Sequence, residues 1–324
     1  MEGDVDISIE TSILYQKLGP LWFHRKVPLL LKKYSPNVFW STLFLLPYQY
    51  KHQVAIPAIL NIHDLSAWVA PKTMKFWNQK YLKLFTLNSL INADEIMCLS
   101  ETTKNLILRI FQDSDDIKNK NYHVIYPGII KPPINRKKPL NMPLGNEFFL
   151  SVGTLEPRKN FETIIRAYIE AKKEYTYLPP LIIAGKPGWR MNETLQQLSK
   201  NQFRSENIFF IEAPSVDELF WLYENCLLFL FPSTYEGFGL PILEAAYFKK
   251  HQIISKIEIF QEIGRWIDGV TYIENPMNPI EWKDAILFYS NKKHQKKIKN
   301  QNLRFFDYKN SAKKMVEILQ KYER

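Results

Sequence analysis

Two glutamates and two glycines in one short stretch of the chain could bind an anion and a diol together. The stretch reads Phe231-Pro-Ser-Thr-Tyr-Glu-Gly-Phe-Gly-Leu-Pro-Ile-Leu-Glu244, and the apolar run 227–231 that leads into it is typical of a buried strand. Glycine accepts a positive φ and a close approach of the backbone, so Gly237 and Gly239 predict a tight turn at positive φ. Pro241 suits the first position of a helix. The sequence therefore predicts a strand, a tight turn and the start of a helix.

The first amide groups of this helix form the predicted anion site. The N–H groups of Phe238, Gly239 and Leu240 lie at the positive end of the helix dipole, where a phosphate is stabilised. Glu236 precedes the turn and Glu244 lies about one helical turn beyond it, so the two carboxylates can flank a bound molecule. Glu244 is placed to accept hydrogen bonds from a diol such as a ribose. A plain strand-to-helix connection with a capping carboxylate is the alternative interpretation.

A second loop supplies positive charge. Its sequence is Gly153-Thr-Leu-Glu-Pro-Arg-Lys-Asn160, between the apolar run 148–152 and a helical pattern. Arg158 offers a planar fork for two phosphate oxygens, and Lys159 offers a compact charge. Both precede a helix, where a diphosphate would lie, although an isolated Arg-Lys pair in a loop is usually solvated surface.

A histidine ends another predicted strand. Residues 57–62 are apolar and lead into His63-Asp64. Ligands of open α/β sheets collect beyond the carboxyl ends of the strands, where these two side chains would project. We expect Asp64 to orient His63 through a hydrogen bond, although a His-Asp pair at a strand end is more often structural.

These motifs together resemble a known family. Glu-x7-Glu around Gly-Phe-Gly-Leu-Pro, Gly-Thr-Leu-Glu-Pro-Arg-Lys-Asn and His-Asp-Leu are similar to the signature of retaining GT-B glycosyltransferases of family 4 (glycosyl transferases group 1), which includes bacterial O-antigen mannosyltransferases. The resemblance implies an α/β fold with two Rossmann-like, doubly wound domains facing a central cleft. It implies transfer of mannose or a similar hexose from a donor such as GDP-mannose or a UDP-sugar, without a metal or another cofactor. The implied acceptor is a growing surface polysaccharide or lipopolysaccharide.

The resemblance also assigns roles to residues. It implies that His63 lies against the donor sugar, that Glu236 holds sugar hydroxyls, and that Arg158 and Lys159 stabilise the leaving diphosphate. Because no carboxylate is evidently placed as a nucleophile, it implies displacement on one face of the sugar, assisted by the leaving group. The predicted donor-binding residues are Gly153, Thr154, Phe238, Gly239, Leu240 and Glu244.

Several positions depart from the family pattern, among them Lys249-Lys-His-Gln252, which stands where relatives have Gly-x-Pro-Val after the second glutamate. Thr154 stands where many relatives have an arginine directly after the glycine, so the positive charge rests on Arg158 and Lys159. Glu212-Ala213-Pro214 stands where relatives usually have a glycine and a β-branched residue near the nucleotide base. The sequence therefore does not identify the residues of the pocket for the base.

The elements that position these residues fall into two halves. A chain of 324 residues with 46% hydrophobic residues can bury two cores. The predicted units are an acceptor-side Rossmann-like domain at 1–130, a proline-rich linker at 131–145, a donor domain at 146–300, and a C-terminal helix at 301–324 packing back on the first domain. A strand at 4–9 and a helix at 11–18 would open the first domain. Full-length relatives have a glycine-rich turn there, so either the first unit has an abbreviated start or another segment takes the place of that turn.

The donor domain alternates strand and helix patterns, which predicts a parallel, doubly wound sheet. Its predicted strands are 148–152, 181–184, 208–211, 227–231, 252–255 and 270–273. Ser215 with Glu218, and Ser100 with Thr103, predict the N-caps of two helices.

Charge and composition limit the partners. The net charge of +10 indicates an anionic partner, which could be a phosphate ester, a nucleic acid or an anionic membrane surface. The basic and aromatic segment 22–34 suits a membrane interface, or equally a helix packed on a sheet with a solvated basic face. No signal peptide is recognised, and Cys98 and Cys226 are predicted as buried free thiols in a reducing compartment. The predicted location is the cytoplasm, with peripheral attachment to the inner face of the membrane left open.

Other functions remain as alternatives. The segment Asp113-Ser-Asp115-Asp116 is similar to the metal-binding pattern of the other glycosyltransferase fold, but it closes a helix, so a solvated loop without a metal is predicted. A nucleotide-sugar 2-epimerase would share the GT-B fold, and an inactive or partner-dependent subunit would share the motifs. A nucleic-acid-binding protein is disfavoured because no recognition module is found. The predicted partners are a nucleotide-sugar donor and a saccharide or lipid-linked saccharide acceptor, with no nucleic acid.

Overall fold

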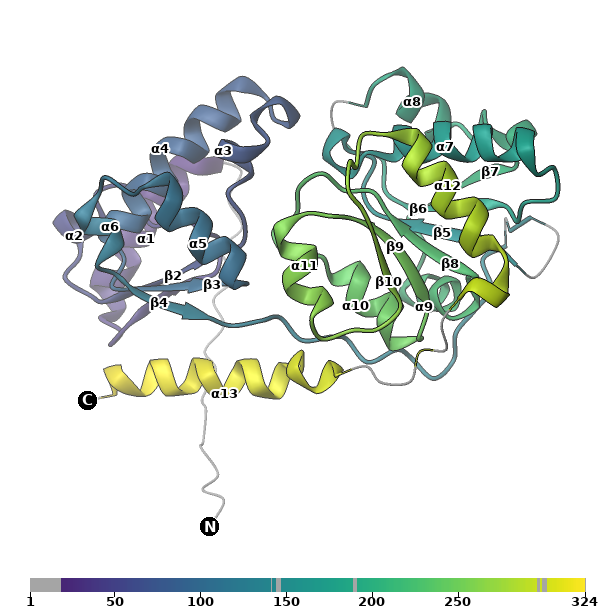
Figure 1. Cartoon of the computed structure of the whole chain (residues 1–324). Helices are drawn as coiled ribbons and strands as arrows, with labels where there is room; N and C mark the ends of the chain where they lie inside the picture. Colours follow the sequence, from purple (N-terminus) through teal and green to yellow (C-terminus); the bar gives the residue numbers. More distant parts are fainter. Residues whose placement is uncertain are drawn as a thin grey trace, which may run out of the picture.

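The chain forms two α/β lobes that lie side by side, with a long helix beneath the first lobe (Figure 1). The computed structural model describes residues 19–140, 142–143, 147–188, 191–295, 298 and 302–323. The predicted strand at 4–9 and helix at 11–18 lie outside these residues. None of the helices in the described part of the chain is long and apolar enough to cross a membrane.

Within the residues that the structure describes, the first lobe is built on four parallel strands in the order β1-β2-β3-β4. The strands are β1 (Phe39–Ser41), β2 (Ala58–Ile62), β3 (Glu95–Cys98) and β4 (Asn121–Val124). The helices are α1 (Gly19–Tyr34), α2 (Tyr50–Gln53), α3 (Ser66–Val69), α4 (Phe76–Asn92), α5 (Glu101–Ile110) and α6 (Asp115–Lys118). In β2, Leu60 packs into the core under the helices, while Ile59 faces the C-terminal helix on the other side of the sheet.

The second lobe contains six parallel strands in the order β10-β9-β8-β5-β6-β7. The strands are β5 (Phe149–Val152), β6 (Leu181–Gly185), β7 (Ile208–Glu212), β8 (Leu228–Phe231), β9 (His251–Ser255) and β10 (Val270–Ile273). The helices are α7 (Phe161–Glu174), α8 (Glu193–Ser199), α9 (Val216–Asn225), α10 (Leu240–Tyr247), α11 (Glu258–Gly264) and α12 (Pro279–Ser290). All six predicted strands and the predicted parallel sheet are confirmed.

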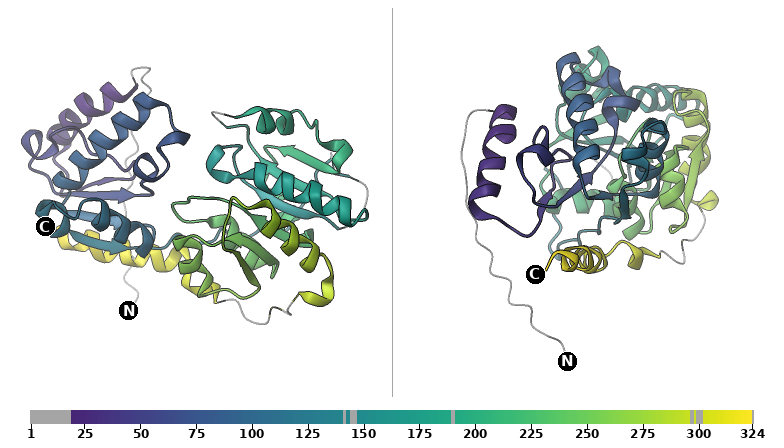
Figure 2. Two further views of the ribbon diagram at one scale, coloured as in Figure 1. Left: turned by 45° about the horizontal axis from the view of Figure 1, so that its top comes forward. Right: turned by 90° about the vertical axis from the view of Figure 1, so that its left-hand side faces the viewer.

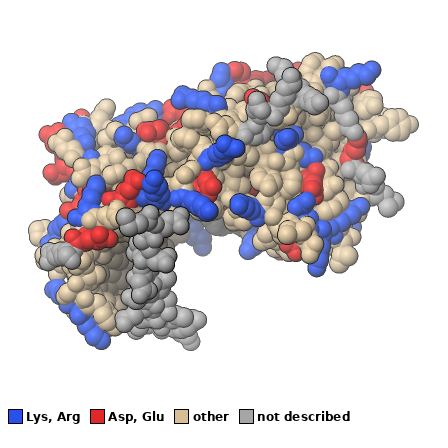
Figure 3. Space-filling view, turned by 90° about the horizontal axis from the view of Figure 1, so that it is seen from below, with Lys and Arg blue, Asp and Glu red and all other residues tan. Residues whose placement is uncertain are grey.

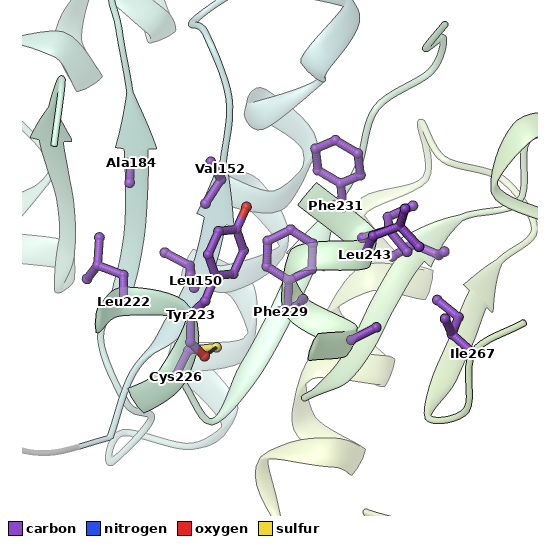
Figure 4. Close-up of a cluster of buried hydrophobic side chains, with 14 of the residues drawn as sticks. Leu150, Val152, Ala184, Leu222, Tyr223, Cys226, Phe229, Phe231, Leu243 and Ile267 are labelled. Carbon is purple, nitrogen blue, oxygen red and sulfur yellow. Dashed lines mark hydrogen bonds between the residues drawn. The ribbon is translucent and has the colours of Figure 1, made fainter. Parts of the chain in front are cut away.

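Both faces of this second sheet are covered. Successive residues of β5 point to opposite cores, Phe149 towards α7 and α12 and Leu150 towards α9 and α10. Figure 4 shows the second of these cores, in which Leu150, Tyr223 and Phe229 pack together. A strand buried on both faces is mostly apolar, which is why these strands are visible in the sequence as apolar runs. The buried Ser151 of β5 is an exception, and its hydroxyl donates to the Leu230 carbonyl at 2.7 Å.

The strand order creates a crevice at one place. From β5 the chain moves outwards to β6 and β7, then returns to place β8 on the other side of β5 and moves the opposite way to β9 and β10. The loops that leave the adjacent strands β5 and β8 therefore diverge at the carboxyl edge of the sheet. In doubly wound sheets this switch point is where ligands bind.

The C-terminal helix α13 (Tyr308–Leu319) belongs to the chain's second half but contacts the first lobe (Figure 2). Met315 and Ile318 pack against Ile59 of β2 and Met97 of β3. Beyond the helix, Lys321 Nζ lies 3.1 Å from Glu95 Oε1. The predicted domain boundaries stay predictions.

Several smaller predictions can be compared with the structure. The predicted solvated loop at 113–116 is wrong in part, because α6 begins at Asp115, where acidic residues in a first turn favour a helix. Segment 22–34 lies in α1, with Leu31 in the core of the lobe and Arg25 and Lys26 exposed, as expected for a helix packed on a sheet.

The cysteines agree with the prediction of buried free thiols. Cys98 and Cys226 are both buried and form no disulfide. Burial raises the pKa of each thiol to about 12, so both stay protonated at neutral pH.

Ala213, just after β7, has a strained backbone. Its φ is 44°, and its amide donates to the Gly185 carbonyl at 2.6 Å. The left-handed region costs a non-glycine residue about 1–2 kcal/mol. Glycine avoids this cost but loses about 0.5–1 kcal/mol of stability, because its unfolded chain is more flexible. We expect Ala213→Gly to raise the free energy of unfolding by about 0.5–1 kcal/mol in urea denaturation. Ala167→Gly, inside α7, should lower it by about 1 kcal/mol, and a loss of stability in both variants would contradict the account of strain at Ala213.

Candidate active site

The two loops that the sequence singled out meet at the switch point. One follows β5 and the other follows β8, and their backbones are tied together. The Thr234 amide donates to the Arg158 carbonyl at 2.8 Å, and Asn160 Nδ2 donates to the Pro232 carbonyl at 3.2 Å. These bonds fix the side chains of both loops relative to one another.

Glu236 joins the two loops through its carboxylate. Oε2 accepts from Arg158 Nη1 at 2.7 Å, and Oε1 accepts from Lys159 Nζ at 2.5 Å. Lys159 and Glu236 are only 8% and 9% exposed. Arg158 Nε also donates to Glu156 Oε2 at 2.9 Å, so the arginine fork holds two carboxylates. Three of the predicted catalytic residues are thus in direct contact, and buried Glu156, to which sequence reasoning gave no role, completes the network.

The neighbouring positive charges determine the protonation state of Glu236. Burial alone would raise its pKa, but the positive charges of Lys159 and then Arg158 outweigh burial and hold the pKa below its usual value. The carboxylate is therefore ionised at neutral pH. Lys159 Nζ also lies 5.1 Å from the centre of the Phe231 ring, which restricts where the ammonium group can move.

This coupling predicts a pH-dependent contribution to stability. Because the folded-state pKa of Glu236 is depressed, its ionised form stabilises the fold above the unfolded-state pKa of about 4.3, and this stabilisation is lost as the pH falls through the folded-state value. We expect Glu236→Gln to lower the free energy of unfolding by about 3 kcal/mol at pH 7, and by progressively less as the pH falls below about 4. Urea denaturation over this pH range measures both effects. Glu218→Gln, in an exposed helix cap, is the control, and a Glu236→Gln deficit that does not change with pH would contradict the prediction.

Gly153 and Thr154 open the first loop. The Gly153 amide donates to the Ala184 carbonyl at 2.9 Å, and Thr154 is half-buried beside it. A Cβ on Gly185 would lie 2.0 Å from the Gly153 carbonyl oxygen, so the end of β6 must carry a glycine there. The backbone of this loop is held tightly against the end of the neighbouring strand.

The turn before α10 has the expected shape, with one correction. Gly239 has a φ of 110° and is the residue before the helix, and Pro241 lies in the first turn. The prediction of a positive φ is confirmed for Gly239 and wrong for Gly237. Gly237 is needed for another reason, because a Cβ there would lie 2.4 Å from the His63 carbonyl oxygen of the first lobe. Leu240 starts the helix and Phe238 is buried in front of it.

Glu244 lies on α10 beside a buried tyrosine. Burial raises the pKa of Glu244, and a hydrogen bond from Tyr223 opposes that rise only in part. The hydroxyl of Tyr223 points towards the side where Val152 and Phe231 end their strands (Figure 4). This hydroxyl is buried and is too poorly aligned with Glu244 to form a full hydrogen bond, so its interaction with Glu244 is weak. The Glu244 carboxylate near the carboxyl edge of the sheet can therefore still accept hydrogen bonds from a ligand.

His63 follows β2 in the first lobe and faces the second lobe. Its backbone carbonyl packs against Gly237, while its ring Nε2 lies 2.9 Å from the Thr42 carbonyl. The expected hydrogen bond from Asp64 is not formed, because Asp64 Oδ1 accepts from the amide of Ser66, the first residue of α3, at 2.7 Å. Thr42, a residue without a motif, orients the histidine instead.

A doubly wound sheet with charged loops at its switch point, beside a second Rossmann-like lobe that carries a histidine at a strand end, is the arrangement of the GT-B class. Residues 134–305, more than half of the chain, match the family model described as glycosyl transferases group 1. The chain belongs to the glycosyl transferases group 1 family, as its motifs predicted.

Curated relatives agree with this assignment. O-antigen chain mannosyltransferase B of Escherichia coli is 29% identical over 238 residues, which cover 71% of this chain and 59% of the relative. O-antigen chain mannosyltransferase RfbU of Salmonella typhimurium is 27% identical over 228 residues, with 70% and 59% covered. The chain thus spans 59% of the length of these two relatives.

Solved structures share the fold. Sucrose-phosphate synthase from Thermosynechococcus elongatus superposes with a TM-score of 0.68 at 16% identity, covering 92% of this chain and 77% of that one. Anabaena HepE, solved with UDP and glucose, gives 0.68 at 16% identity, covering 95% and 84%. The predicted GT-B fold is confirmed.

Proposed function

We propose that the protein is a retaining glycosyltransferase that moves mannose or a similar hexose from a nucleotide diphosphate sugar to a growing surface polysaccharide or lipopolysaccharide. The observation that carries the proposal is the buried contact of Arg158, Lys159 and Glu236 at the switch point of the second sheet. The names of the O-antigen mannosyltransferase relatives support the sugar and the acceptor class.

The proposed roles follow from the positions of the groups. Lys159 and the amides of Phe238, Gly239 and Leu240 stabilise the charge that develops on the leaving diphosphate. A donor diphosphate would share Lys159 with the Glu236 carboxylate, because the ammonium group has three N–H donors. Arg158 adds charge while its fork holds Glu236 in place.

The two ends of the donor would meet different groups. Glu236 accepts hydrogen bonds from the sugar hydroxyls, and Glu244 accepts hydrogen bonds from the ribose. Gly153 and Thr154 line the approach to the diphosphate, and His63 meets the sugar from the first lobe. Departure of the diphosphate then lets the acceptor attack from the same face, which retains the anomeric configuration. Among the described residues, no group of three or more His, Cys, Asp and Glu side chains is arranged to hold a metal ion.

A screen of radiolabelled donors tests the proposal. Wild-type protein is incubated with GDP-mannose and several UDP-hexoses, and released sugar and nucleoside diphosphate are measured. We expect turnover of one donor by the wild type and by Lys283→Ala, a control whose ion pair with Glu174 is remote from the crevice. Glu236→Ala and Lys159→Ala should lose turnover, and equal rates in all of these proteins would overturn the proposed site. Donor converted to an epimer that stays attached to its nucleotide would instead favour the epimerase alternative.

We also propose that the acceptor is lipid-linked and that the enzyme works as a peripheral protein at the inner face of the cytoplasmic membrane. Phe76 and Trp77, at the start of α4, are 55% and 77% exposed, and Lys80 Nζ lies 4.5 Å from the Phe76 ring. Aromatic side chains with a basic rim suit an anionic lipid interface. On the face seen in Figure 3, basic side chains are spread over both lobes with acidic ones between them. Sedimentation with anionic vesicles should capture the wild type and less of Trp77→Ala, and equal capture of both would contradict this location.

A further inference from the structure

The side chain of Tyr235, the residue before Glu236, reaches from the second lobe to the first, and we call such a contact between the lobes a crossing. Tyr235 belongs to the loop after β8, but its ring packs against the core cluster of the first lobe. Its hydroxyl accepts a hydrogen bond from the Leu65 amide at 2.8 Å. Leu65 follows His63 by two residues, so this bond joins the loop that carries Glu236 to the loop that carries His63. A buried amide that loses such a partner is left unsatisfied, which makes the bond costly to break.

Glu262 makes a second crossing near the linker. It lies on α11, is 8% exposed, and accepts hydrogen bonds from the Glu101 amide at 2.9 Å and the Thr102 amide at 2.7 Å. These are the first two amides of α5 in the other lobe, and they have no partner inside their own helix. The hydroxyl groups of Thr102 and Tyr126 also donate to this carboxylate. A carboxylate of the second lobe thus completes the N-terminus of a helix in the first, where the helix dipole favours it. Figure 1 shows α5 and α11 facing each other between the lobes.

The loop between these crossings is held at its other end as well. The Phe238 ring lies 6.1 Å from the Tyr126 ring and 6.0 Å from the Phe306 ring, measured between centroids. Tyr126 follows β4 of the first lobe, and its backbone carbonyl accepts from Ser311 of α13. The segment 235–238, which we name the donor loop, therefore contacts the first lobe or its flanking segments at both ends.

We propose that Tyr235 and Glu262 are positioning residues that hold the two lobes in one closed arrangement, and that this arrangement places the donor loop opposite His63. The proposal rests on the proposed function and adds residues that contact neither nucleotide nor sugar. The close packing of Gly237 on the His63 carbonyl requires both lobes to keep this spacing. The nucleoside diphosphate would be bound by the second lobe alone, whereas the step that breaks the sugar bond needs both lobes.

Conservative variants separate these contributions. Tyr235→Phe removes only the bond to Leu65, and Glu262→Gln removes the charge that faces the start of α5. Tyr168→Phe is a matched control, because the Tyr168 hydroxyl donates to the Pro179 carbonyl within the second lobe. Glu218→Gln, in the helix cap at Ser215, is the control for the carboxylate. Glutamine keeps an acceptor oxygen and could preserve some of these hydrogen bonds. Glu262→Ala is therefore the second variant, because it removes every acceptor atom of the carboxylate.

Amide hydrogen exchange reports on the crossings directly. We expect exchange at Leu65 to rise at least about tenfold in Tyr235→Phe, and exchange at Glu101 and Thr102 to rise similarly in Glu262→Gln or Glu262→Ala. The controls should leave these amides unchanged. Unchanged exchange in all of the Tyr235 and Glu262 variants would overturn the proposal.

Kinetics and binding report on positioning. We expect kcat for sugar transfer to fall about tenfold in Tyr235→Phe and Glu262→Gln, while the affinity for GDP or UDP stays within about twofold of the wild type. Loss of nucleotide affinity in proportion to kcat would overturn the proposal, because it would show damage to the second lobe itself. If the wild type binds neither nucleotide, the proposed function fails, and the exchange rates still decide whether the crossings hold the lobes.

Discussion

Replacing Lys159 with alanine is expected to lower kcat/KM for the donor nucleotide sugar by about 10²–10³-fold. Lys159 is 8% exposed, and its ammonium group points at the Glu236 carboxylate between the two loops of the crevice. Where water is excluded, a cation acts on developing negative charge far more strongly than it does in solvent. The same variant should weaken binding of the product nucleoside diphosphate, measured by titration calorimetry.

Lys159→Met distinguishes charge from packing. Methionine keeps an unbranched side chain over the Phe231 ring but carries no charge, so we expect it to lose as much activity as alanine does. Lys283→Ala, which breaks the ion pairs of Lys283 with Glu174 and Asp284, should keep wild-type activity. A methionine variant with near wild-type kcat/KM would show that Lys159 serves packing and not the diphosphate.

Adding a methyl group at Gly237 is expected to lower kcat by about a hundredfold or more while leaving nucleotide affinity within about threefold. A Cβ there would lie 2.4 Å from the His63 carbonyl oxygen and 2.9 Å from Asp64 Cβ, so the backbones of the two lobes would have to separate. The separation would move His63 away from Glu236. The groups proposed to bind the nucleotide all lie in the second lobe and would stay in place.

Three measurements on Gly237→Ala check this expectation. Steady-state kinetics gives kcat, calorimetry gives the affinity for the nucleoside diphosphate, and small-angle scattering should show an increased radius of gyration. Thermal unfolding shows whether the lobes themselves stay folded. A variant with wild-type kcat would mean that the contact between Gly237 and His63 has no part in catalysis.

The second sheet was predictable because its strands are covered on both faces. Phe149 and Leu150 pack in different cores, so neither face of β5 meets solvent. The strand is therefore apolar apart from Ser151, whose hydroxyl donates to the Leu230 carbonyl. The capping box at Ser215 and Glu218 was predictable because both of its hydrogen bonds are local. The turn at Gly239 was predictable because only glycine commonly adopts its φ.

The contacts around Glu236 could not be read from local patterns. Its bonds to Arg158 and Lys159 exist because the sheet places β8 beside β5, and the sequence does not specify that order. The same holds for Gly237, whose small size serves a contact with another lobe and not a positive φ. The hydrogen bond expected between His63 and Asp64 is absent because Asp64 Oδ1 accepts from the Ser66 amide two residues further on, a local bond that aspartate commonly forms.

The hydrogen bonds of Glu262 and Tyr235 to the first lobe could not be predicted from the sequence. Glu262 accepts from amides 161 and 160 residues earlier in the chain, and Tyr235 accepts from an amide 170 residues earlier. Nothing in the helical pattern around Glu262 separates it from an ordinary surface glutamate. Only the fold brings the start of α5 against it.

A crystal structure with a bound nucleoside diphosphate tests the central claim most directly. The account predicts the diphosphate within hydrogen-bond distance of Lys159 Nζ and the amides of Phe238, Gly239 and Leu240, with the ribose against Glu244. A nucleotide bound elsewhere, with Lys159 and Glu236 still joined and untouched by it, would contradict the account.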